Sequence, residues 1–453
     1  MTAAAVSPAG ADDLWRAGIR VIAGEVRAGT LTAREVVMRA LARMDIRNGG
    51  LGAIVARADA LALAQADEID RRVRAGEDPG PLAGIPFSVK DIIATDGLPT
   101  TAGGHVLDEV ELGVEAPQVT RLRTAGAIVV GKSNCPELAI GVHTINERYG
   151  LTANPTGSHT VGGSSGGDAA AVASGMTAFG LGTDFGGSIR WPASCTGLYG
   201  WRPEAEDPDA HHAAAGQLPV SRGVELCPFQ AEVQVVGTLT RDLDDAEMLF
   251  GVLSPGPALP AADELVFFDR LDLLDVSSGV VDALAALAVR ARRAGFRVRT
   301  ESGAILAALE ANYSELRRAD SLSRLIDERA GGVGRLSAAT ARVVAEAEAS
   351  ASQSMQAAAD RRRLLVEFDR MLPSDSVAVL PISIAPPTDY APSIEQDLSI
   401  LAPARAISST GLASFAVPTM PLPVQLVASR GESARLFATV RRLQQGRAFD
   451  AGS

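Results

Sequence analysis

Cysteine and aromatic residues are scarce in this chain of 453 residues. Cys135, Cys195 and Cys227 lie far apart and form no CxxC pair, so the sequence indicates neither a disulfide framework nor a zinc site. Aromatic residues make up 4% of the chain and are not interleaved with basic ones, as a surface that stacks on nucleic-acid bases would require. The chain has no HExxH motif either, and we expect no metal ion and no cofactor.

Positive charge and long apolar runs are lacking too. The net charge of −12 argues against a nucleic-acid partner. No segment approaches the ~20 apolar residues of a membrane-spanning helix, and residues 1–10 lack the basic and apolar regions of a signal peptide. Hydrophobic residues nevertheless make up 47% of the chain, which is enough for a large core. We expect a cytoplasmic protein with no membrane partner, and a homodimer stays open.

Helix-like and strand-like segments alternate along the chain, which predicts a layered α/β fold in a single domain over residues 1–453. Thr32 and Glu35 have the spacing of a capping box, which predicts a helix start at that point. In the first half we expect helices at 12–45 (with a break near Gly29), 57–75 and 117–124, and strands at 82–89, 127–132 and 178–183. In the second half we expect helices over most of 277–371 and at 394–409 and 432–443, a weak strand near 296–298, and strands at 376–381 and 424–427.

Two serines are embedded in glycine-rich segments. Residues 161–167 read VGGSSGG and contain Ser164, and residues 182–190 read GTDFGGSIR and contain Ser188. The first segment precedes an alanine-rich helix expected at 169–175, and the second leads from a strand into a helix that starts near Ser188. Such turns place a side chain beside free backbone N–H groups at a helix start. A serine that can lose its proton in this setting is a candidate nucleophile.

Lys90 is the candidate base for these serines. It ends the apolar segment 82–89, where the stem of the lysine would be buried. A desolvated lysine has a lowered pKa and can hold a neutral amine near neutral pH, so it can accept a proton. Asp91 would oppose that shift if it pointed the same way, but neighbouring side chains on a strand face opposite sides. One lysine and two serines together indicate acyl transfer without histidine.

Each of these features has other interpretations. A single glycine-rich segment is equally typical of a tight turn or of close helix packing. Neither segment fits the GxxxxGK[ST] or GxGxxG pattern of a phosphate-binding loop. Residues 162–166 do read GxSxG, yet the preceding residues 154–160 are polar, which disfavours a nucleophile elbow with a Ser-His-Asp triad. The histidines form no constellation in the sequence: they are His105, His143, His159, His211 and His212.

Residues 84–203 resemble the signature region of the amidase signature family. The intervals that separate Lys90, Ser164 and Ser188 match the family as well, and weaker resemblance continues at 236–241 and 411–427. The resemblance implies the family's fold, a layered α/β/α domain around a central mixed and twisted β-sheet. The segments that carry it read GIPFSVKD, GKSNCPELA, NPTGSHTVGGSSGGDAAAVASG and GTDFGGSIRWPASCTGLYG.

The resemblance also implies a role for each of several residues. Ser188 would be the nucleophile that attacks the carbonyl of a small or medium linear acyl amide, Ser164 would relay protons, and Lys90 would be the general base. A cis peptide bond after Gly163 would hold Ser164 in place. Backbone N–H groups would form an oxyanion hole, namely those of Phe185, Gly186, Gly187 and Ser188. Three further residues would support the loops by hydrogen bonds and charge pairing: Ser165, Asp184 and Arg190.

Three departures from the family pattern bear on the substrate. The segment GWRPE at 200–204 stands where GLKPT is more usual, residues 205–216 differ from the family's loop, and His143 occupies a position where a small or polar residue is common. These positions lie outside the catalytic ones. The departures therefore leave the expected chemistry intact and bear on the shape of the acyl pocket.

Three other functions stay open. An acyltransferase would pass the acyl group from the same Ser188 intermediate to an amine instead of to water. The glutamine-amidase component of a tRNA-dependent amidotransferase would need partner proteins, and the altered segment 199–216 disfavours it. A catalytically silent binding protein is disfavoured as well, because a binding scaffold does not require a buried lysine.

Overall fold

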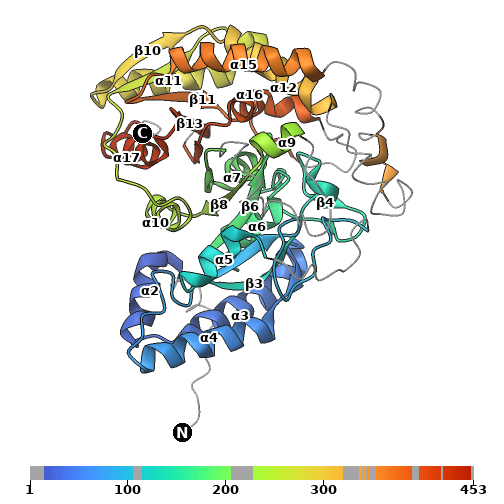
Figure 1. The fold of residues 1–453 in the computed structure, drawn as a ribbon, viewed down its shortest axis with the longest axis vertical. Helices are drawn as coiled ribbons and strands as arrows, with labels where there is room; N and C mark the ends of the chain where they lie inside the picture. The colour runs from blue at the N-terminus through green and yellow to red at the C-terminus, as the bar shows by residue number, and fades with distance from the viewer. Residues whose placement is uncertain are drawn as a thin grey trace.

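A mixed β-sheet forms the centre of the molecule (Figure 1). The computed structural model describes residues 15–105, 115–205, 228–319, 354–389, 397–419 and 422–449, with a few positions between 336 and 345. Within these residues the main sheet has eleven strands in the order β1-β3-β2-β6-β8-β7-β12-β13-β11-β9-β10. The strands are β1 (Ile54–Arg57), β2 (Pro86–Lys90), β3 (Ile128–Ser133), β6 (Phe179–Asp184), β7 (Tyr199–Arg202), β8 (Val235–Thr240), β9 (Glu264–Phe268), β10 (Arg297–Glu301), β11 (Ser376–Pro381), β12 (Ser414–Val417) and β13 (Val424–Ala428).

Parallel pairing is confined to two parts of this sheet. Strand β2 is parallel to both β3 and β6, and β9 is parallel to both β10 and β11. The other neighbouring strands are antiparallel. A separate short hairpin joins β4 (Ile145–Asn146) to β5 (Gly150–Leu151).

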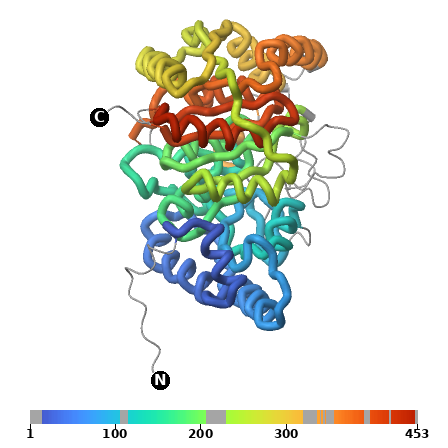
Figure 2. The backbone as a smooth tube through the Cα atoms, turned by 90° about the vertical axis from the view of Figure 1, so that its left-hand side faces the viewer, coloured from blue at the N-terminus to red at the C-terminus, as the bar shows by residue number. Residues whose placement is uncertain are grey.

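Helices surround the sheet. The N-terminal helices lie at one end of the long axis, and α11, α12 and α15 lie at the other (Figures 1 and 2). The α-helices are α2 (Ile19–Ala28), α3 (Ala33–Leu51), α4 (Asp59–Arg74), α5 (Pro117–Thr124), α6 (Gly166–Ala173), α7 (Arg190–Thr196), α9 (Pro228–Val233), α10 (Leu243–Leu253), α11 (Ser278–Arg293), α12 (Ala304–Ala319), α15 (Ser354–Met371), α16 (Ala402–Thr410) and α17 (Ser433–Gln445). None of the described helices is long and apolar enough to cross a membrane.

The pleat of β7 shows which helices cover which face. Successive residues of a strand point to opposite faces. Gly200 faces α7, because a Cβ at Gly200 would lie 2.8 Å from the Cβ of Ala193. The next residue, Trp201, contacts Phe250 of α10 and lies near Phe437 of α17 on the other face. The glycine lets α7 pack closely against the sheet, and a layer of helix thus covers each face.

Most of the predicted elements are present. The helix expected at 12–45 is divided at Gly29, which has a left-handed backbone, and the capping box between Thr32 and Glu35 is formed. The strand predicted at 82–89 begins only at Pro86. Strands β1, β7, β8 and β9 were not predicted from the sequence. Beyond Ala205, the segment 205–216 that differs from the family's loop lies outside the described residues, as do His211, His212 and Cys227.

The close packing of α7 on the sheet predicts that Gly200→Ala destabilises the protein. The added methyl group would meet Ala193 at 2.8 Å and the Cγ2 of Ile189 at 3.2 Å. Overpacking of this kind lowers the free energy of unfolding by about 1–3 kcal/mol. Urea denaturation followed by circular dichroism measures it.

The matched control is Gly24→Ala in α2, where an added Cβ meets nothing within 4 Å. This variant should gain about 0.5–1 kcal/mol, because alanine is the better helix former. Equal midpoints for the two variants would show that α7 is not held close to the sheet.

Candidate active site

Lys90, Ser164 and Ser188 meet at one edge of the sheet. Lys90 is the last residue of β2, which is parallel to β6. The turn after β6 holds Ser188, and Ser164 lies two residues before α6. Because the carboxyl ends of parallel strands share one edge of a sheet, β2 and the turn after β6 bring Lys90 and Ser188 to the same place.

The two serine-bearing turns are joined through Ser165. Its backbone N–H donates to the carbonyl oxygen of Ser188 at 3.1 Å, and its hydroxyl donates to the carbonyl oxygen of Thr183 at 3.2 Å. The peptide bond between Gly163 and Ser164 is cis, as the family resemblance predicts. Ser165 therefore links the first turn to the second.

The amine of Lys90 is fully buried between two hydroxyl groups. Its Nζ lies 2.7 Å from the Oγ of Ser164 and 2.8 Å from the Oγ1 of Thr183. Burial lowers the pKa of Lys90 to about 8, and the charges of Asp168 and Asp184 act in the opposite direction. The contact with Thr183 was not predicted from the sequence, because nothing in the spacing separates this threonine from its neighbours on β6.

A second buried lysine lies on β3, the strand next to the one that carries Lys90. Lys132 of β3 donates to the Oγ1 of Thr100 at 2.9 Å and to the carbonyl oxygen of Ile93. Burial lowers its pKa to about 8, and the charge of Asp91 opposes that shift. The charge of Asp91 therefore raises the pKa of Lys132, in agreement with the alternation of side chains on a strand, which directs Asp91 away from the face of Lys90.

Asp168 is a buried carboxyl group near both lysines. It lies on α6, and its Oδ1 accepts a hydrogen bond from the hydroxyl of Ser88 at 2.6 Å. Burial raises its pKa to about 6, and the hydrogen bond and the charges of Lys90 and Lys132 oppose that rise. Asp168 was not predicted from the sequence, since one acidic residue in an alanine-rich helix gives no sign that it is buried.

The backbone around Ser188 offers several N–H groups. Ser188 is half-buried, and its hydroxyl has no hydrogen-bond partner in the described part of the chain. The N–H of Gly187 donates to the Oδ1 of Asp184 at 2.9 Å. Of the four predicted oxyanion donors, the N–H groups of Phe185, Gly186 and Ser188 remain unused by the described residues. Gly187 could take part only by leaving Asp184.

Asp184 and Arg190 hold this turn together. Both side chains are fully buried, and the guanidinium group of Arg190 binds the carboxylate through two nitrogens, at 2.8 and 3.0 Å. The carboxylate also accepts the N–H of Ile189 at 3.1 Å. Despite the opposing effect of burial, the charge of Arg190 keeps the pKa of Asp184 well below its usual range. The predicted pairing of Asp184 with Arg190 is therefore present.

Arg202 adds a second buried cation to this group. Its Nε lies 3.6 Å from the Oδ1 of Asp184, and the guanidinium group donates to the carbonyl oxygens of Leu412 and Val233 at 2.6 Å. Arg202 belongs to the segment GWRPE that departs from the family pattern. Neither Arg202 nor His143 lines the pocket beside Ser188, and residues 206–216 of the remaining departure lie outside the described part of the chain.

A pocket of about 100 Å³ opens beside Ser188, and Ser164 and Thr183 also line it. None of the described histidines does, which leaves the Ser-His-Asp interpretation without support. Among the described residues, no group of three or more histidine, cysteine, aspartate or glutamate side chains is placed to hold a metal ion. The rest of the lining comprises Leu138, Ala139, Ile140, Gly141, Phe185, Gly186, Gln230, Gln234, Tyr313, Arg317, Leu398, Leu401 and Arg405.

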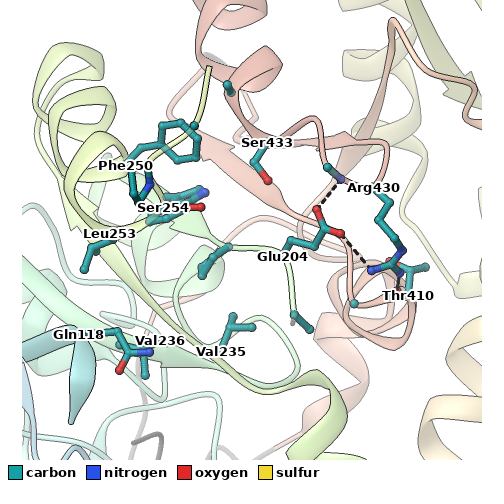
Figure 3. A pocket seen from close by; sticks show the side chains of 18 of the residues that line it. Gln118, Glu204, Val235, Val236, Phe250, Leu253, Ser254, Thr410, Arg430 and Ser433 are labelled. Atoms are coloured by element: carbon teal, nitrogen blue, oxygen red, sulfur yellow. Dashed lines mark hydrogen bonds and ion pairs between the residues drawn. The ribbon is translucent and has the colours of Figure 1, made fainter. Parts of the chain in front are cut away.

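A larger cavity of about 800 Å³ contains none of the predicted site residues (Figure 3). Its charged groups are satisfied within the protein. Glu204 accepts hydrogen bonds from Arg430 at 3.0 Å and from the N–H of Gly431 at 2.8 Å, and Arg361 pairs with Glu232. The described lining thus offers no reactive group, and we place the candidate site at the smaller pocket.

Comparison with known proteins identifies a family and several relatives that match part of the chain. The model of the family described as Amidase matches residues 35–263. The A component of the glutamyl-tRNA(Gln) amidotransferase of Chloroflexus aurantiacus is 46% identical over 177 residues, which are 39% of this chain and 36% of that protein. The chain therefore spans little more than a third of that relative's length in the match.

Solved structures match over nearly the full length. The crystal structure of an amidase has a TM-score of 0.80 at 26% identity and covers 94% of this chain and 99% of its own. A chain from an inhibitor-bound complex, related to the origins of an s-triazine catabolic enzyme, has a TM-score of 0.82 at 22% identity and covers 96% and 100%. At 22% identity, the similarity to the second structure shows only that the fold is shared. The predicted α/β fold with a central mixed sheet is confirmed.

The buried ion pair at the turn predicts that Asp184→Asn is strongly destabilising. The substitution keeps the shape of the side chain but leaves Arg190 and Arg202 without a buried counter-charge. Removing one partner of such a pair lowers the free energy of unfolding by about 3–5 kcal/mol. Urea denaturation measures this change.

The control is Asp282→Asn on the exposed surface of α11, which should stay within about 0.5 kcal/mol of the unchanged protein. If Asp184→Asn proves as mild as the control, the carboxylate does not carry the charge balance of this turn.

Proposed function

Because the chain belongs to the amidase family, we propose that it hydrolyses the carbon–nitrogen bond of a linear acyl amide through an acyl-enzyme on Ser188. One observation carries the proposal: the buried amine of Lys90 lies 2.7 Å from the hydroxyl of Ser164. Ser164 shares a pocket with Ser188, whose hydroxyl is not engaged by any described residue. A base, a relay and a free nucleophile are what acyl transfer requires.

In the proposed reaction, the Oγ of Ser188 attacks the carbonyl carbon while its proton passes to Ser164. Ser164 in turn gives its own proton to the neutral amine of Lys90. The tetrahedral oxyanion accepts hydrogen bonds from the N–H groups of Phe185, Gly186 and Ser188, and one such donor is typically worth about 3–4 kcal/mol of the barrier. The C–N bond then breaks as the proton returns through Ser164 to the leaving nitrogen. Water then attacks the acyl-enzyme and gives its proton through Ser164 to Lys90. The proton returns through Ser164 to the Oγ of Ser188 as the carboxylic acid leaves.

Three residues act as positioning residues in this scheme. Ser165 joins the two turns, and Asp184 with Arg190 fixes the backbone that carries the oxyanion donors. Rigid donors need no rearrangement when charge develops, and this is where electrostatic stabilisation is most effective. Their substitution should therefore affect kcat more than KM.

A second candidate function is the release of ammonia from glutamine. The 46% identity with a component of a glutamyl-tRNA(Gln) amidotransferase favours it, although that match covers only 36% of the relative. A glutaminase assay separates the candidates: turnover of glutamine above that of other amides supports the second one. Hydroxylamine added to the assay detects acyl transfer to an amine, because it diverts the acyl-enzyme from water.

The proposed nucleophile predicts that Ser188→Ala abolishes both turnover and covalent labelling by an acylating inhibitor. Loss of the Oγ removes the atom that bonds to the acyl carbon, so activity should fall to background. Lys90→Ala should be nearly as damaging, because both serines then keep their protons. Intact-mass spectrometry measures the labelling. The control, Ser158→Ala at an exposed position, should label and turn over normally. A labelled Ser188→Ala protein would refute the assignment.

The lowered pKa of Lys90 predicts how activity depends on pH. Below about pH 8 the amine of the free enzyme is mostly protonated and cannot act as a base. We therefore expect kcat/KM to rise with pH, to inflect near 8 and to level off above it. A pH–rate profile from about 6 to 10 measures this.

Asp168→Asn tests the cause of that profile. The negative charge of Asp168 raises the pKa of Lys90, so its removal should move the inflection to lower pH. An inflection that moves upward, or a profile that is flat across this range, would contradict the role of Lys90 as the base.

A further inference from the structure

Aromatic rings cluster at the pocket beside Ser188, where Phe185 and Tyr313 line the pocket and Phe229 packs against both of them. Phe185, Phe229 and Tyr313 contact one another with ring centroids 5.1 to 5.7 Å apart. One arginine guanidinium group lies over each ring, an arrangement in which the ring face attracts the cation. The three pairs are Arg317 over Phe185 at 5.5 Å, Arg361 over Phe229 at 5.4 Å and Arg405 over Tyr313 at 5.2 Å.

Two of these three arginines have a carboxylate partner, and one does not. Arg405 pairs with Glu310 at 2.8 Å, and Arg361 pairs with Glu232. Arg317 is half-buried on α12 and lines the pocket, but it has neither an ion pair nor a hydrogen-bond acceptor within the described part of the chain. An arginine that stays without a counter-charge beside a reactive serine is placed to bind an anionic group.

Two other donors of the same pocket also lack an acceptor. The side-chain oxygen of Gln234 accepts from Gln230 at 2.6 Å, which fixes the orientation of the amide and leaves its Nε2 buried without a partner. The Nε of Arg405 is buried and unpaired as well. Buried donors of this kind are costly unless a ligand satisfies them. The pocket thus has N–H donors in excess of acceptors.

We propose that this pocket binds a carboxylate group on the amide substrate, with Arg317 as its main partner and Gln234 and Arg405 as further donors. The inference rests on the proposed function, because it names the substrate class of the same site: amides that carry a second, anionic carboxylate, such as the half-amides of dicarboxylic acids. The larger cavity offers no such excess, since its arginines are bound to Glu204, Glu232 and, for Arg121, the carbonyl oxygen of Leu253.

The first test compares matched substrates. Half-amides of dicarboxylic acids with four to six carbons are assayed beside aliphatic amides in which a methyl group replaces the carboxylate. The selectivity is the ratio of the two kcat/KM values. Wild-type protein should prefer the half-amide, and Arg317→Met should lower that ratio at least about tenfold, mainly through KM, because a charged hydrogen bond is lost.

The matched control is Arg318→Met. Arg318 is the exposed neighbour of Arg317 on α12 and does not line the pocket, so this variant removes the same charge elsewhere. Its selectivity should equal that of the wild type. Should Arg317→Met fail to fold, Gln234→Leu removes a second donor of the same pocket and should lower the ratio in the same direction.

A second test does not depend on turnover. Calorimetric titration with glutarate, a dicarboxylate, should show binding to the wild type and at least about tenfold weaker binding to Arg317→Met. An unchanged ratio and unchanged glutarate affinity in Arg317→Met would overturn this inference while leaving the proposed function intact. Glutarate binding without hydrolysis of any amide would do the reverse, because it would reject the proposed reaction and support the carboxylate site.

Discussion

The burial of the Lys90 amine is the constraint on which the rest of the site depends. A charged ammonium group in this position would have only hydroxyl groups in contact with it, since its two close neighbours are Ser164 and Thr183. The protein removes water from the amine, and this removal weakens the charged form. The carboxylates of Asp168 and Asp184 favour the charged form of the amine and raise its pKa. The pKa of about 8 is the result of these two opposing influences.

The other buried charged groups have different partners. This difference distinguishes the groups that hold loops in place from the candidate base. Asp184 has two arginines beside it and several N–H donors, so its charge is fully compensated. Lys132 has Asp91 as a counter-charge and carbonyl or hydroxyl oxygens as acceptors. Each of these groups holds loops in place. Lys90, in contrast, forms a hydrogen bond with Ser164, which lines the pocket. Proton transfer needs such an arrangement.

The sequence predicted the elements and site residues whose signals are local. The Thr32–Glu35 capping box, the helix at 117–124 and the strand at 376–381 depend on neighbouring residues, and all are present. Strands β1 and β7 have four residues each, too few for a clear alternation, and β7 contains a glycine that weakens strand propensity. They form because neighbouring strands supply their hydrogen bonds: β3 pairs with β1 at the edge of the sheet, and β8 and β12 flank β7.

The site residues likewise divide into those with a local signal in the sequence and those without one. Lys90, Ser164 and Ser188 were found from glycine-rich turns, an apolar strand and a family resemblance. Thr183, Asp168 and Arg317 gave no signal of their own, since their importance comes from contacts between segments far apart in the chain. The engagement of Gly187 with Asp184 belongs to this group as well, because the direction of a backbone N–H is a property of the folded turn. Local patterns identify the candidate site residues, and tertiary structure decides their partners.

The hydrogen bond from Ser165 to Ser188 has a consequence for how such a protein can change over time. It ties the two serine-bearing turns together at the sheet edge, while another part of the pocket lining comes from α12 and from the short 3-10 helix Leu398–Leu401. The side chains in that part of the lining take no part in the hydrogen bond between the turns. A new preference for substrates can therefore arise by substitutions on α12 and its neighbours, while the geometry at the serines is inherited unaltered.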